Sequence, residues 1–482
     1  MDKKVILYVT ISIIISALIT SLLPKKQTGV PKEVYRVYIE GKSLGLIKSK
    51  NALEKYIDKE ITISGFAEKV RNIKWVQFIV LRNGTQRVQI TIEKSEEKNA
   101  EMVKKVEGLT NESTIKVTGK LVKNENVKMG GMEIIPTSLE ITSLAAPELP
   151  ISITNKDAAQ IDTRMDNRFI DLRNDYNMNI FKIQSEFVKA MRKYLYDNDF
   201  TEIHTPKLIG AASESGSEVF EVDYFGNKAY LAQSPQFYKQ MAMASGFGRV
   251  FEVAPCFRAE NSNTNRHATE FTSFDIEFSY IDSYEDVMDL EEDLLIEGLK
   301  AVKEKYGDLI KETYGVDVVV PTKPFPRIKL QDLYEKLTEK YGYKVPDHDI
   351  GDMNAEAEKL TSRYAMEEFG HEFIFVTDFS KTKRAFYHMR KNDVPQGYDL
   401  IWKGTEITTG AQREHRYDHL RHNADEKGLT KDVEFYMQFF KYGMPPHGGF
   451  AIGVDRLTLL LLGLDHIRDA QFIFRGPNRL YP

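Results

Sequence analysis

The sequence predicts an α+β protein that consists of a small β-barrel followed by a larger domain of strands and helices. The chain has 482 residues, which at roughly 150 residues per domain corresponds to about three domains. Short alternating strands fill residues 59–146, whereas amphipathic helical periodicity and longer strands fill residues 181–482. The composition, with 42% hydrophobic and 28% charged residues, is that of a folded protein and excludes a mainly disordered chain.

Charge and cysteine content limit the classes of function. Lys and Arg total 66 against 71 Asp and Glu, which gives a formal net charge of −5. A uniformly basic surface is therefore excluded, and any contact with nucleic acid requires a local basic patch. The single cysteine, Cys256, has no partner for an internal disulfide, and no Cys/His cluster has the spacing of a structural zinc site.

The N-terminal stretch is unusual because residues 5–23 carry no charge. As a helix rising ~1.5 Å per residue they would reach about 28 Å, close to the ~30 Å hydrocarbon core of a bilayer. We therefore expect residues 1–26 to form a membrane anchor, followed by a linker or short extension over residues 27–58. A cleaved signal peptide is the competing interpretation, although no A-x-A site follows the run. The Lys and Arg residues after the run favour a cytoplasmic body tethered by this helix.

The middle of the chain has the strand order of a small barrel. Five short strands are expected, at residues 61–70, 75–83, 87–94, 113–123 and 132–141. A helical stretch separates the third strand from the fourth, which is the order of an OB-fold barrel, whose open face binds nucleic acid. Arg71, Trp75 and Phe78 lie near the first hairpin turn, where an aromatic ring can stack on an unpaired base. Alternation places Trp75 and Phe78 on opposite faces, so at most one of them fills the barrel core.

Residues 147–180 are expected to form a hinge between the two domains. This segment holds three arginines, Arg164, Arg168 and Arg173. Two interpretations stay open: the arginines form surface salt bridges, or they contact a phosphate backbone where the two domains meet.

The last three hundred residues carry the chemistry. They contain no GxxxxGK[ST] phosphate loop, no GxGxxG after a strand, no HExxH and no GxSxG, so a bound nucleotide would be held by side chains. A strand–loop–strand segment supplies Arg258, Arg266 and Phe271, and Arg456 lies where a glycine-rich strand enters an apolar helix. Three arginines beside an aromatic ring suit a triphosphate and a base, because guanidinium groups bind phosphate oxygens bidentately and stay charged.

Three segments in this region occur together and in order: DFTEIHTPKL, FRAENSNTNRHATEFTSFDIEF and GFAIGVDRL. They resemble the three motifs of class II aminoacyl-tRNA synthetases, and the chain is similar to the compact archaeal and eukaryotic type of aspartyl-tRNA synthetase over about residues 59–482. The resemblance implies an OB-fold anticodon-binding domain at residues 59–146 and a class II catalytic domain at residues 181–482, with an antiparallel sheet flanked by helices. It also implies ATP, L-aspartate and tRNA as partners, and a homodimer.

The resemblance assigns nucleotide-binding roles to matching positions. The ATP-binding positions are Arg258, Glu260, Arg266, His267, Phe271, Glu406 and Arg456. Among these, Arg258 and Arg456 are the implied catalytic residues, holding the α- and γ-phosphates. Phe271 stacks on adenine, and Arg456 covers the other side of the base. Glu406 and Thr409 match the acid and hydroxyl that hold Mg²⁺, a hard ion that prefers carboxylate and phosphate oxygens. Thr409 replaces the more usual Ser, which keeps the hydroxyl but adds a methyl group.

Five further positions match the amino-acid pocket of the family: Glu214, Gln236, Lys239, Asp275 and Arg413. Two cations that face one side chain, Lys239 and Arg413, favour a carboxylate, because neutral asparagine would leave them unpaired and desolvated. Three barrel positions match those that contact the anticodon: Phe78, Gln89 and Arg71.

The implied function is an aspartate–tRNA ligase that activates L-aspartate with ATP and transfers it to the 3′ end of tRNA-Asp, with tRNA-Asn left open. One alternative is an asparagine–tRNA ligase, which Lys239 and the neighbouring SPQ stretch disfavour. The other is a catalytically retired, membrane-tethered homologue that only binds tRNA. Retention of the positions listed above, Glu260, Phe271, Glu406, Arg413 and Arg456, argues against it.

Overall fold

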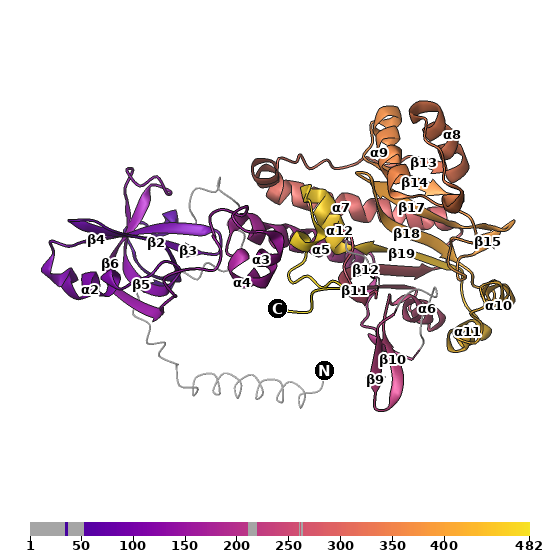
Figure 1. Cartoon of the computed structure of the whole chain (residues 1–482), viewed down its shortest axis with the longest axis horizontal. Coiled ribbons are helices and arrows are strands. Elements are labelled where there is room, and N and C mark those ends of the chain that lie inside the picture. The colour runs from indigo at the N-terminus through magenta and orange to yellow at the C-terminus, as the bar shows by residue number, and fades with distance from the viewer. Residues whose placement is uncertain (1–33, 37–52, 211–218, 260, 262–263) are drawn as a thin grey trace, which may run out of the picture. The chain divides into compact units, whose positions relative to one another are not determined.

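The computed structural model describes residues 34–36, 53–210, 219–259, 261 and 264–482. The membrane anchor expected at residues 1–26, with its apolar run 5–23, lies outside these ranges. Among the described residues, no helix has both the length and the apolar character needed to cross a membrane. The chain divides into two compact units, Met1–Glu148 and Leu149–Pro482 (Figure 1).

The first unit contains a five-stranded barrel. Its strands are β2 (Glu60–Asn72), β3 (Val76–Asn83), β4 (Gln86–Glu93), β5 (Thr114–Lys123) and β6 (Met132–Ser143). They pair in the order β2-β3-β4-β6-β5, and a further pairing of β2 with β5 closes the barrel. Helix α2 (Ala100–Glu107) lies between β4 and β5, and β1 (Val34–Arg36) pairs in parallel with β2. The predicted OB-fold order, five strands with a helix between the third and fourth, is therefore confirmed.

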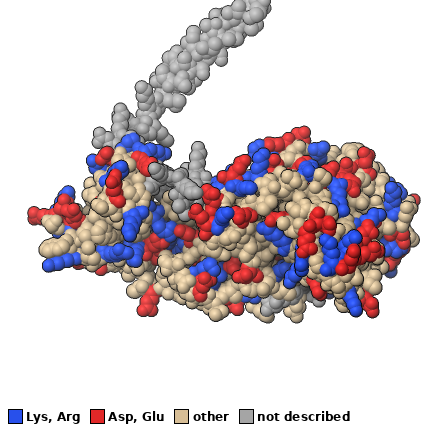
Figure 2. Space-filling model, turned by 90° about the horizontal axis from the view of Figure 1, so that it is seen from above, with Lys and Arg blue, Asp and Glu red and all other residues tan. Residues whose placement is uncertain are grey.

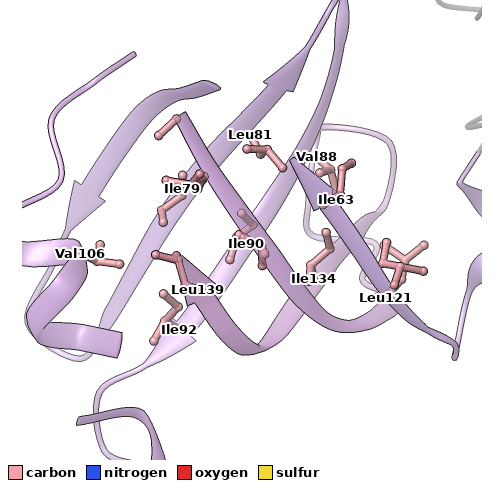
Figure 3. Close-up of a cluster of buried hydrophobic side chains, with 14 of the residues drawn as sticks. Ile63, Ile79, Leu81, Val88, Ile90, Ile92, Val106, Leu121, Ile134 and Leu139 are labelled. Atoms are coloured by element: carbon pink, nitrogen blue, oxygen red, sulfur yellow. The ribbon is translucent and has the colours of Figure 1, made fainter. Parts of the chain in front are cut away.

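Alternation along the strands builds the barrel core. In β3, Ile79 and Leu81 are buried, whereas Val80 between them is half-buried and faces outward. Ile63, Val88, Ile90, Ile134 and other aliphatic side chains from the remaining strands fill the interior, as Figure 3 shows. Neither Trp75, which is 69% exposed, nor Phe78, which is half-buried, fills the core, so both aromatic rings are accessible.

The second unit is organised around an eight-stranded sheet. Its strands are β7 (Thr201–Glu202), β11 (Arg249–Phe257), β12 (Glu270–Ser279), β13 (Arg327–Lys329), β14 (Phe373–Thr377), β17 (Gly397–Trp402), β18 (Thr405–Arg413) and β19 (His447–Gly453). They pair in the order β13-β14-β17-β18-β19-β12-β11-β7. All neighbours are antiparallel except the two pairs at the sheet edges, β13 with β14 and β11 with β7. The predicted antiparallel sheet flanked by helices is confirmed.

The two faces of the sheet have different neighbours. Helices α5 (Asp175–Asp197), α7 (Tyr284–Tyr314) and α12 (Val454–Leu462) pack together on one face. Successive residues of β19 show the alternation: a Cβ on Gly448 would meet Val287 of α7, whereas a Cβ on Gly449 would meet Glu277 on the other face. We call that other face the site face, because it carries the residues discussed below.

Shorter elements complete the second unit. The helices are α3 (Ile161–Asp166), α4 (Arg168–Asp171), α6 (Gln236–Ala244), α8 (Leu330–Tyr341), α9 (Ala355–Phe369), α10 (Tyr417–Glu426), α11 (Glu434–Lys441) and α13 (Ile467–Ala470). The strands are β8 (Leu208–Ile209), β9 (Glu221–Tyr224) and β10 (Asn227–Leu231) in one small sheet, and β15 (Arg390–Lys391) and β16 (Val394–Pro395) in another. A single 3₁₀ turn occurs at Asp347–Asp349 in this unit, and two others occur at Glu54–Tyr56 and Glu97–Asn99 in the first unit.

Most of the segment expected as a hinge, residues 147–180, belongs to the second unit. Arg168 is 2% exposed, pairs with Asp171, and donates to three main-chain carbonyl oxygens of residues 469–472. Arg164 pairs with Asp171 and Asp469. For Arg168, both interpretations, a surface salt bridge and a phosphate contact, are therefore wrong. The reason is that Arg168 is buried and its guanidinium N–H groups bind Asp171 and main-chain oxygens about three hundred residues further along the chain.

The surface carries both signs of charge, as the composition predicts. In the view of Figure 2, Lys and Arg side chains are interspersed with Asp and Glu over the visible described surface. Many of these groups pair with each other, for example Lys116 with Glu140 and Lys300 with Glu297. This mixed surface agrees with the exclusion of a uniformly basic protein.

Candidate active site

A cavity of about 360 Å³ opens on the site face of the second unit. Among its lining residues are seven that the sequence assigned to ATP or Mg²⁺: Arg258, Arg266, His267, Phe271, Glu406, Thr409 and Arg456. Glu260, the remaining ATP position, lies outside the described residues. Gln233, Ser234 and Ser273 also line the cavity and were not predicted.

The cavity is lined by an arginine and an aromatic ring that contact each other. The guanidinium carbon of Arg258 lies 5.2 Å from the centroid of the Phe271 ring. Arg258 follows the end of β11 by one residue rather than lying in the strand, and its N–H donates to the carbonyl oxygen of Thr269 at 2.9 Å. The guanidinium group offers a charged surface that suits a phosphate, and the ring beside it offers an apolar surface that suits a base.

The other two arginines of the cavity are held by neighbouring polar groups. Arg266 Nη1 lies 3.5 Å from a carboxylate oxygen of Glu358 and 3.5 Å from the hydroxyl of Thr405. Arg456 Nη1 donates to the main-chain oxygen of Glu406 at 2.9 Å. Each contact uses one guanidinium donor out of five, so both groups retain capacity to bind phosphate oxygens.

A β-bulge brings Glu406 and Thr409 to the same side of β18. In a regular strand, residues three apart face opposite ways, but the register of β17 and β18 shifts between Leu400 and Ile401, which leaves Ile407 unpaired. As a result, the Thr409 hydroxyl lies 2.9 Å from Glu406 Oε1. The sequence assigned both residues to one metal ion, and the bulge is the local feature that places them together.

Asp399 of β17 is a third oxygen donor at this place. The Thr409 hydroxyl also lies 2.9 Å from Asp399 Oδ1, and Arg384 contacts both Asp399 oxygens at 2.8 and 2.6 Å. Burial raises the pKa of Asp399 to about 7. Arg384 lowers this pKa and only partly offsets the effect of burial, while the nearby Glu406 carboxylate raises it further. The sequence analysis missed Asp399, although an acid inside the apolar strand GYDLIW is itself a signal.

The oxygen atoms of Glu406, Thr409 and Asp399 suit a hard divalent cation that also binds phosphate. One hydroxyl proton cannot serve both the Glu406 and the Asp399 oxygen, so acceptors outnumber donors at this point. Within the described residues, no group of three or more His, Cys, Asp and Glu side chains forms a metal cage. Mg²⁺ does not require one, because it commonly takes one or two protein carboxylates and fills its shell with water and phosphate oxygens.

Next to the cavity lies a fully buried cluster of four charges. Lys239 of α6 is 2% exposed, and its Nζ lies 3.2 Å from Asp275 Oδ1 and 3.3 Å from Glu277 Oε2. Arg413 of β18 donates from Nε to Glu277 Oε1 at 3.1 Å and from Nη2 to the Gly449 carbonyl oxygen at 2.9 Å. Burial opposes ionisation of Glu277, but Arg413 and Lys239 together hold the pKa of that carboxyl below its usual value.

This cluster changes the electrostatic argument made from the sequence. The two cations face not an empty space but Glu277, a residue that the sequence analysis missed and that alternation from Asp275 would have placed on the same face. Lys239 and Arg413 are therefore already paired before any substrate enters. The argument that asparagine would leave them unpaired is wrong in that form, since Glu277 compensates them.

Gln236, another predicted amino-acid position, lies on the same helix as Lys239. Gln236 is 5% exposed and donates to Gln240, whose amide group contacts His447 and the hydroxyl of Tyr436. Burial lowers the pKa of His447 to about 4, so this ring is neutral at physiological pH. Glu214 lies outside the described residues.

The three predicted anticodon positions share the outer face of the barrel. Arg71 pairs with Phe78 across β2 and β3, and Phe78 pairs with Thr91 in β4. Gln89, two residues from Thr91, donates to the Thr91 hydroxyl at 3.2 Å and to Glu133 Oε2 at 3.1 Å. An aromatic ring, an arginine and an oriented amide on one face can stack on and hydrogen-bond to unpaired bases.

An OB-fold barrel, and an antiparallel sheet beside a cavity that Arg258, Arg266 and Arg456 line, are the parts that the resemblance to class II aminoacyl-tRNA synthetases implies. Family comparison agrees. Residues 160–474 match the model for class II tRNA synthetases (D, K and N), and residues 61–142 match the OB-fold nucleic acid binding domain. The chain belongs to this synthetase family.

Individual relatives are similar over nearly their whole length. The aspartate–tRNA(Asp) ligase of Pyrococcus abyssi is 40% identical over 438 residues, which cover 90% of this chain and 99% of the relative. The aspartate–tRNA(Asp/Asn) ligase of Methanopyrus kandleri is 41% identical, covering 88% and 96%. Among solved structures, the aspartyl-tRNA synthetase of Entamoeba histolytica has a TM-score of 0.77 at 31% identity, covering 94% and 97%. The asparaginyl-tRNA synthetase of Pyrococcus horikoshii, solved with asparaginyl-adenylate, has a TM-score of 0.79 at 30% identity, covering 89% and 97%.

Proposed function

We propose that this protein is an aspartate–tRNA ligase, which activates L-aspartate with ATP and transfers it to the 3′ end of tRNA-Asp. The observation that carries the proposal is the adjacency of two groups on one sheet face: the arginine-lined cavity and the buried cations Lys239 and Arg413. Relatives that cover nearly the whole chain and are named aspartate–tRNA ligases support the same choice.

In this proposal the first step needs no general base. The α-carboxylate of aspartate is ionised at pH 7 and attacks the α-phosphorus of ATP directly, with pyrophosphate as the leaving group. Arg258 binds the α-phosphate, Arg456 and Arg266 bind the rest of the triphosphate chain, and Phe271 stacks on adenine. Their contribution is to position the reactants and to stabilise the charge that develops on phosphate oxygens.

Mg²⁺ would be held by Glu406, Thr409 and Asp399, where it would neutralise charge on the phosphate oxygens when bound. The protein's own contribution at this point is to keep the three oxygens within one site, through the bulge at Ile407 and the ion pair between Arg384 and Asp399. His267 lies at the same cavity and is assigned to the triphosphate.

The side chain of aspartate would bind next to Lys239 and Arg413, with Gln236 and Asp275 nearby. Glu214, which lies outside the described residues, is assigned to the same amino-acid pocket. Arg413 keeps one guanidinium N–H beyond those directed at Glu277, His388 and the Gly449 carbonyl oxygen, and a second carboxylate can bind to it. Lys239 Nζ already donates to Asp275 and to the carbonyl oxygens of Ile276 and Phe450, so it acts on a substrate carboxylate through its charge. Discrimination against asparagine then depends on electrostatic attraction inside this buried cluster. Two nearby cations attract the carboxylate of aspartate more strongly than the uncharged amide of asparagine.

Two assays test the proposal. Aspartate-dependent exchange between pyrophosphate and ATP is expected, with asparagine inactive at the same concentration. Replacing Arg413 by Ala should reduce exchange by about 10- to 100-fold, because the aspartate carboxylate loses a charged hydrogen-bond donor that contributes roughly 1.5–3 kcal/mol. The matched control is Arg416→Ala, which removes a more exposed arginine three residues away whose partner is Glu414. Exchange that prefers asparagine would contradict the proposal and favour the asparagine alternative.

The transfer step and the partners are tested separately. We propose that Phe78, Gln89 and Arg71 bind the anticodon, that the active body works in the cytosol, where ATP and tRNA are found, and that it forms a homodimer. Charging of transcripts of tRNA-Asp and tRNA-Asn measures whether one or both are substrates. Light scattering of the purified protein measures the number of subunits.

A further inference from the structure

The two side chains proposed to enclose adenine come from separate elements. Phe271 lies at the start of β12, and Arg456 lies in the first turn of α12. One side chain outside the nucleotide cavity bonds next to both of them. Gln471 Nε2 donates to the main-chain oxygen of Glu270 at 2.8 Å and to Asp455 Oδ2 at 2.8 Å. Since Glu270 precedes Phe271 and Asp455 precedes Arg456, one amide group links the two walls of the adenine slot.

This link is buried and has charged character. Gln471 is 5% exposed and Asp455 is 6% exposed. Asp455 Oδ2 also accepts the N–H of Thr272 at 3.2 Å, so β12 is tied to α12 on both sides of Phe271. Hydrogen bonds to a carboxylate are roughly twice as strong as those between neutral groups.

The segment that carries Gln471 is itself fixed from the other side. Arg168 donates to the main-chain oxygens of Asp469 at 3.1 Å, Gln471 at 2.8 Å and Phe472 at 3.1 Å. Arg164 adds a bond of 2.7 Å to the Asp469 carboxylate. The main chain at Gln471 is therefore held by a buried arginine, while its side chain holds the nucleotide walls.

We propose that Gln471 is a positioning residue that sets the width of the adenine slot between Phe271 and Arg456. This inference rests on the proposed function, because it takes adenine as the ligand of the slot. Without the Gln471 amide, the Glu270 side of Phe271 loses its bond to α12, and only the bond from Thr272 N–H to Asp455 still joins the start of β12 to α12. Arg456 keeps its own bond to the Glu406 carbonyl oxygen at 2.9 Å, so the phosphate-binding end is retained. A Gln471 variant is therefore expected to bind ligands that contain adenine more weakly.

The test compares ligands with and without the base. Gln471→Met keeps the length of the side chain but has no amide, and Gln471→Asn keeps the amide but is one methylene too short to reach both acceptors. The control is Arg479→Ala, because Arg479 belongs to the same C-terminal region but pairs with Asp162 and Asp166 instead. Calorimetric titration with ATP, AMP and tripolyphosphate, each with Mg²⁺, gives the dissociation constants, and a thermal melt of each variant checks folding.

Both Gln471 variants are expected to bind ATP and AMP about tenfold more weakly, with tripolyphosphate within about twofold of the unmodified protein. Arg479→Ala should bind all three ligands normally. Unchanged ATP and AMP binding in both Gln471 variants overturns the inference, and so does an equal loss for all three ligands, which indicates a general structural defect. Failure of the unmodified protein to bind ATP is a different result, because it contradicts the proposed function itself.

Discussion

Arg413 and Glu277 form an ion pair that solvent does not reach. The distance from Nε to Oε1 is 3.1 Å, and the side chains are 3% and 0% exposed. The second oxygen of Glu277 lies 3.3 Å from Lys239 Nζ, so this carboxylate contacts both buried cations, and Asp275 lies 3.2 Å from Lys239 as the second acid of the cluster. Removing one partner of such a pair is costly because the other charge stays buried.

Glu277→Gln is therefore expected to lower the free energy of unfolding of the second unit by about 3 kcal/mol. The chain has two tryptophans, Trp75 in the barrel and Trp402 buried in β17. In a Trp75→Phe background, the fluorescence of Trp402 alone follows urea unfolding of the second unit. Glu297→Gln is the control, because its pair with Lys300 is exposed and should cost less than about 1 kcal/mol. Equal effects of the two substitutions would show that Glu277 does not compensate the cations.

Thr409 provides a test of the proposed metal site. Thr409→Ser keeps the hydroxyl that contacts Glu406 and Asp399, whereas Thr409→Val keeps the shape and removes it. We expect the serine variant to retain exchange activity and the valine variant to need about 10- to 100-fold more Mg²⁺ for half-maximal exchange. The measurement is a Mg²⁺ titration of pyrophosphate exchange at saturating ATP. A valine variant with an unchanged Mg²⁺ requirement would place the metal elsewhere.

A substitution at Phe78 tests tRNA binding separately from amino-acid activation. Phe78→Ala should raise the KM for tRNA about tenfold, because stacking of one base on an aromatic ring contributes roughly 1–3 kcal/mol. Aspartate-dependent pyrophosphate exchange without tRNA should not change. Lys116→Ala serves as the control, since Lys116 is an exposed cation of β5 that pairs with Glu140. Should both variants charge tRNA equally well, the Phe78 face is not the anticodon site.

Glu291 of α7 gives the protein a stability that depends on pH. Burial raises the pKa of Glu291 to about 8, although the Tyr398 hydroxyl donates to it at 2.7 Å. The folded protein therefore holds this proton more tightly than the unfolded chain does. The resulting stability is fully present below the unfolded pKa of about 4.5 and is lost as pH rises toward 8, by at most ~1.4 kcal/mol per pH unit.

Glu291→Gln removes this ionisation. The variant is expected to be more stable than the unmodified protein at pH 8.5, and the difference should shrink steadily toward pH 5. Urea unfolding followed by Trp402 at these two pH values measures it, with Glu297→Gln on the same helix as the exposed control. A difference that is the same at both pH values would mean that Glu291 does not carry the proton.

Much of the site followed from strand alternation and motif order. The strand–loop–strand segment was expected to supply Phe271, and the structure places Phe271 and Asp275 in β12, where alternation puts residues four apart on one face. The same rule applied once more, from Asp275 to Glu277, reaches the carboxylate that was missed. Glu406 and Thr409 are different, because a period of two sets them on opposite faces and only the bulge at Ile407 reverses this. Bulges leave no reliable periodic signal in a single sequence.

Long-range partners were the part that sequence reasoning did not reach. The partners of Arg168 are main-chain oxygens at residues 469–472, and main-chain oxygens have no sequence signature. Cation spacing alone predicted exposed arginines, whereas the fold buries one of them. Sequence reasoning also did not show that Lys239 and Arg413 share Glu277 as a partner. This contact depends on how the fold places α6, β12 and β18 side by side.

Gly449 of β19 limits how this site can vary between proteins. A Cβ at this position would lie 2.1 Å from the Ile276 carbonyl oxygen and 2.5 Å from Glu277 Oε2. The first contact is with main chain, which cannot rotate away. Every other amino acid would thus separate β19 from β12 or displace the charge cluster. In a saturation library selected only for folded protein, with no demand for activity, position 449 should return a single residue type.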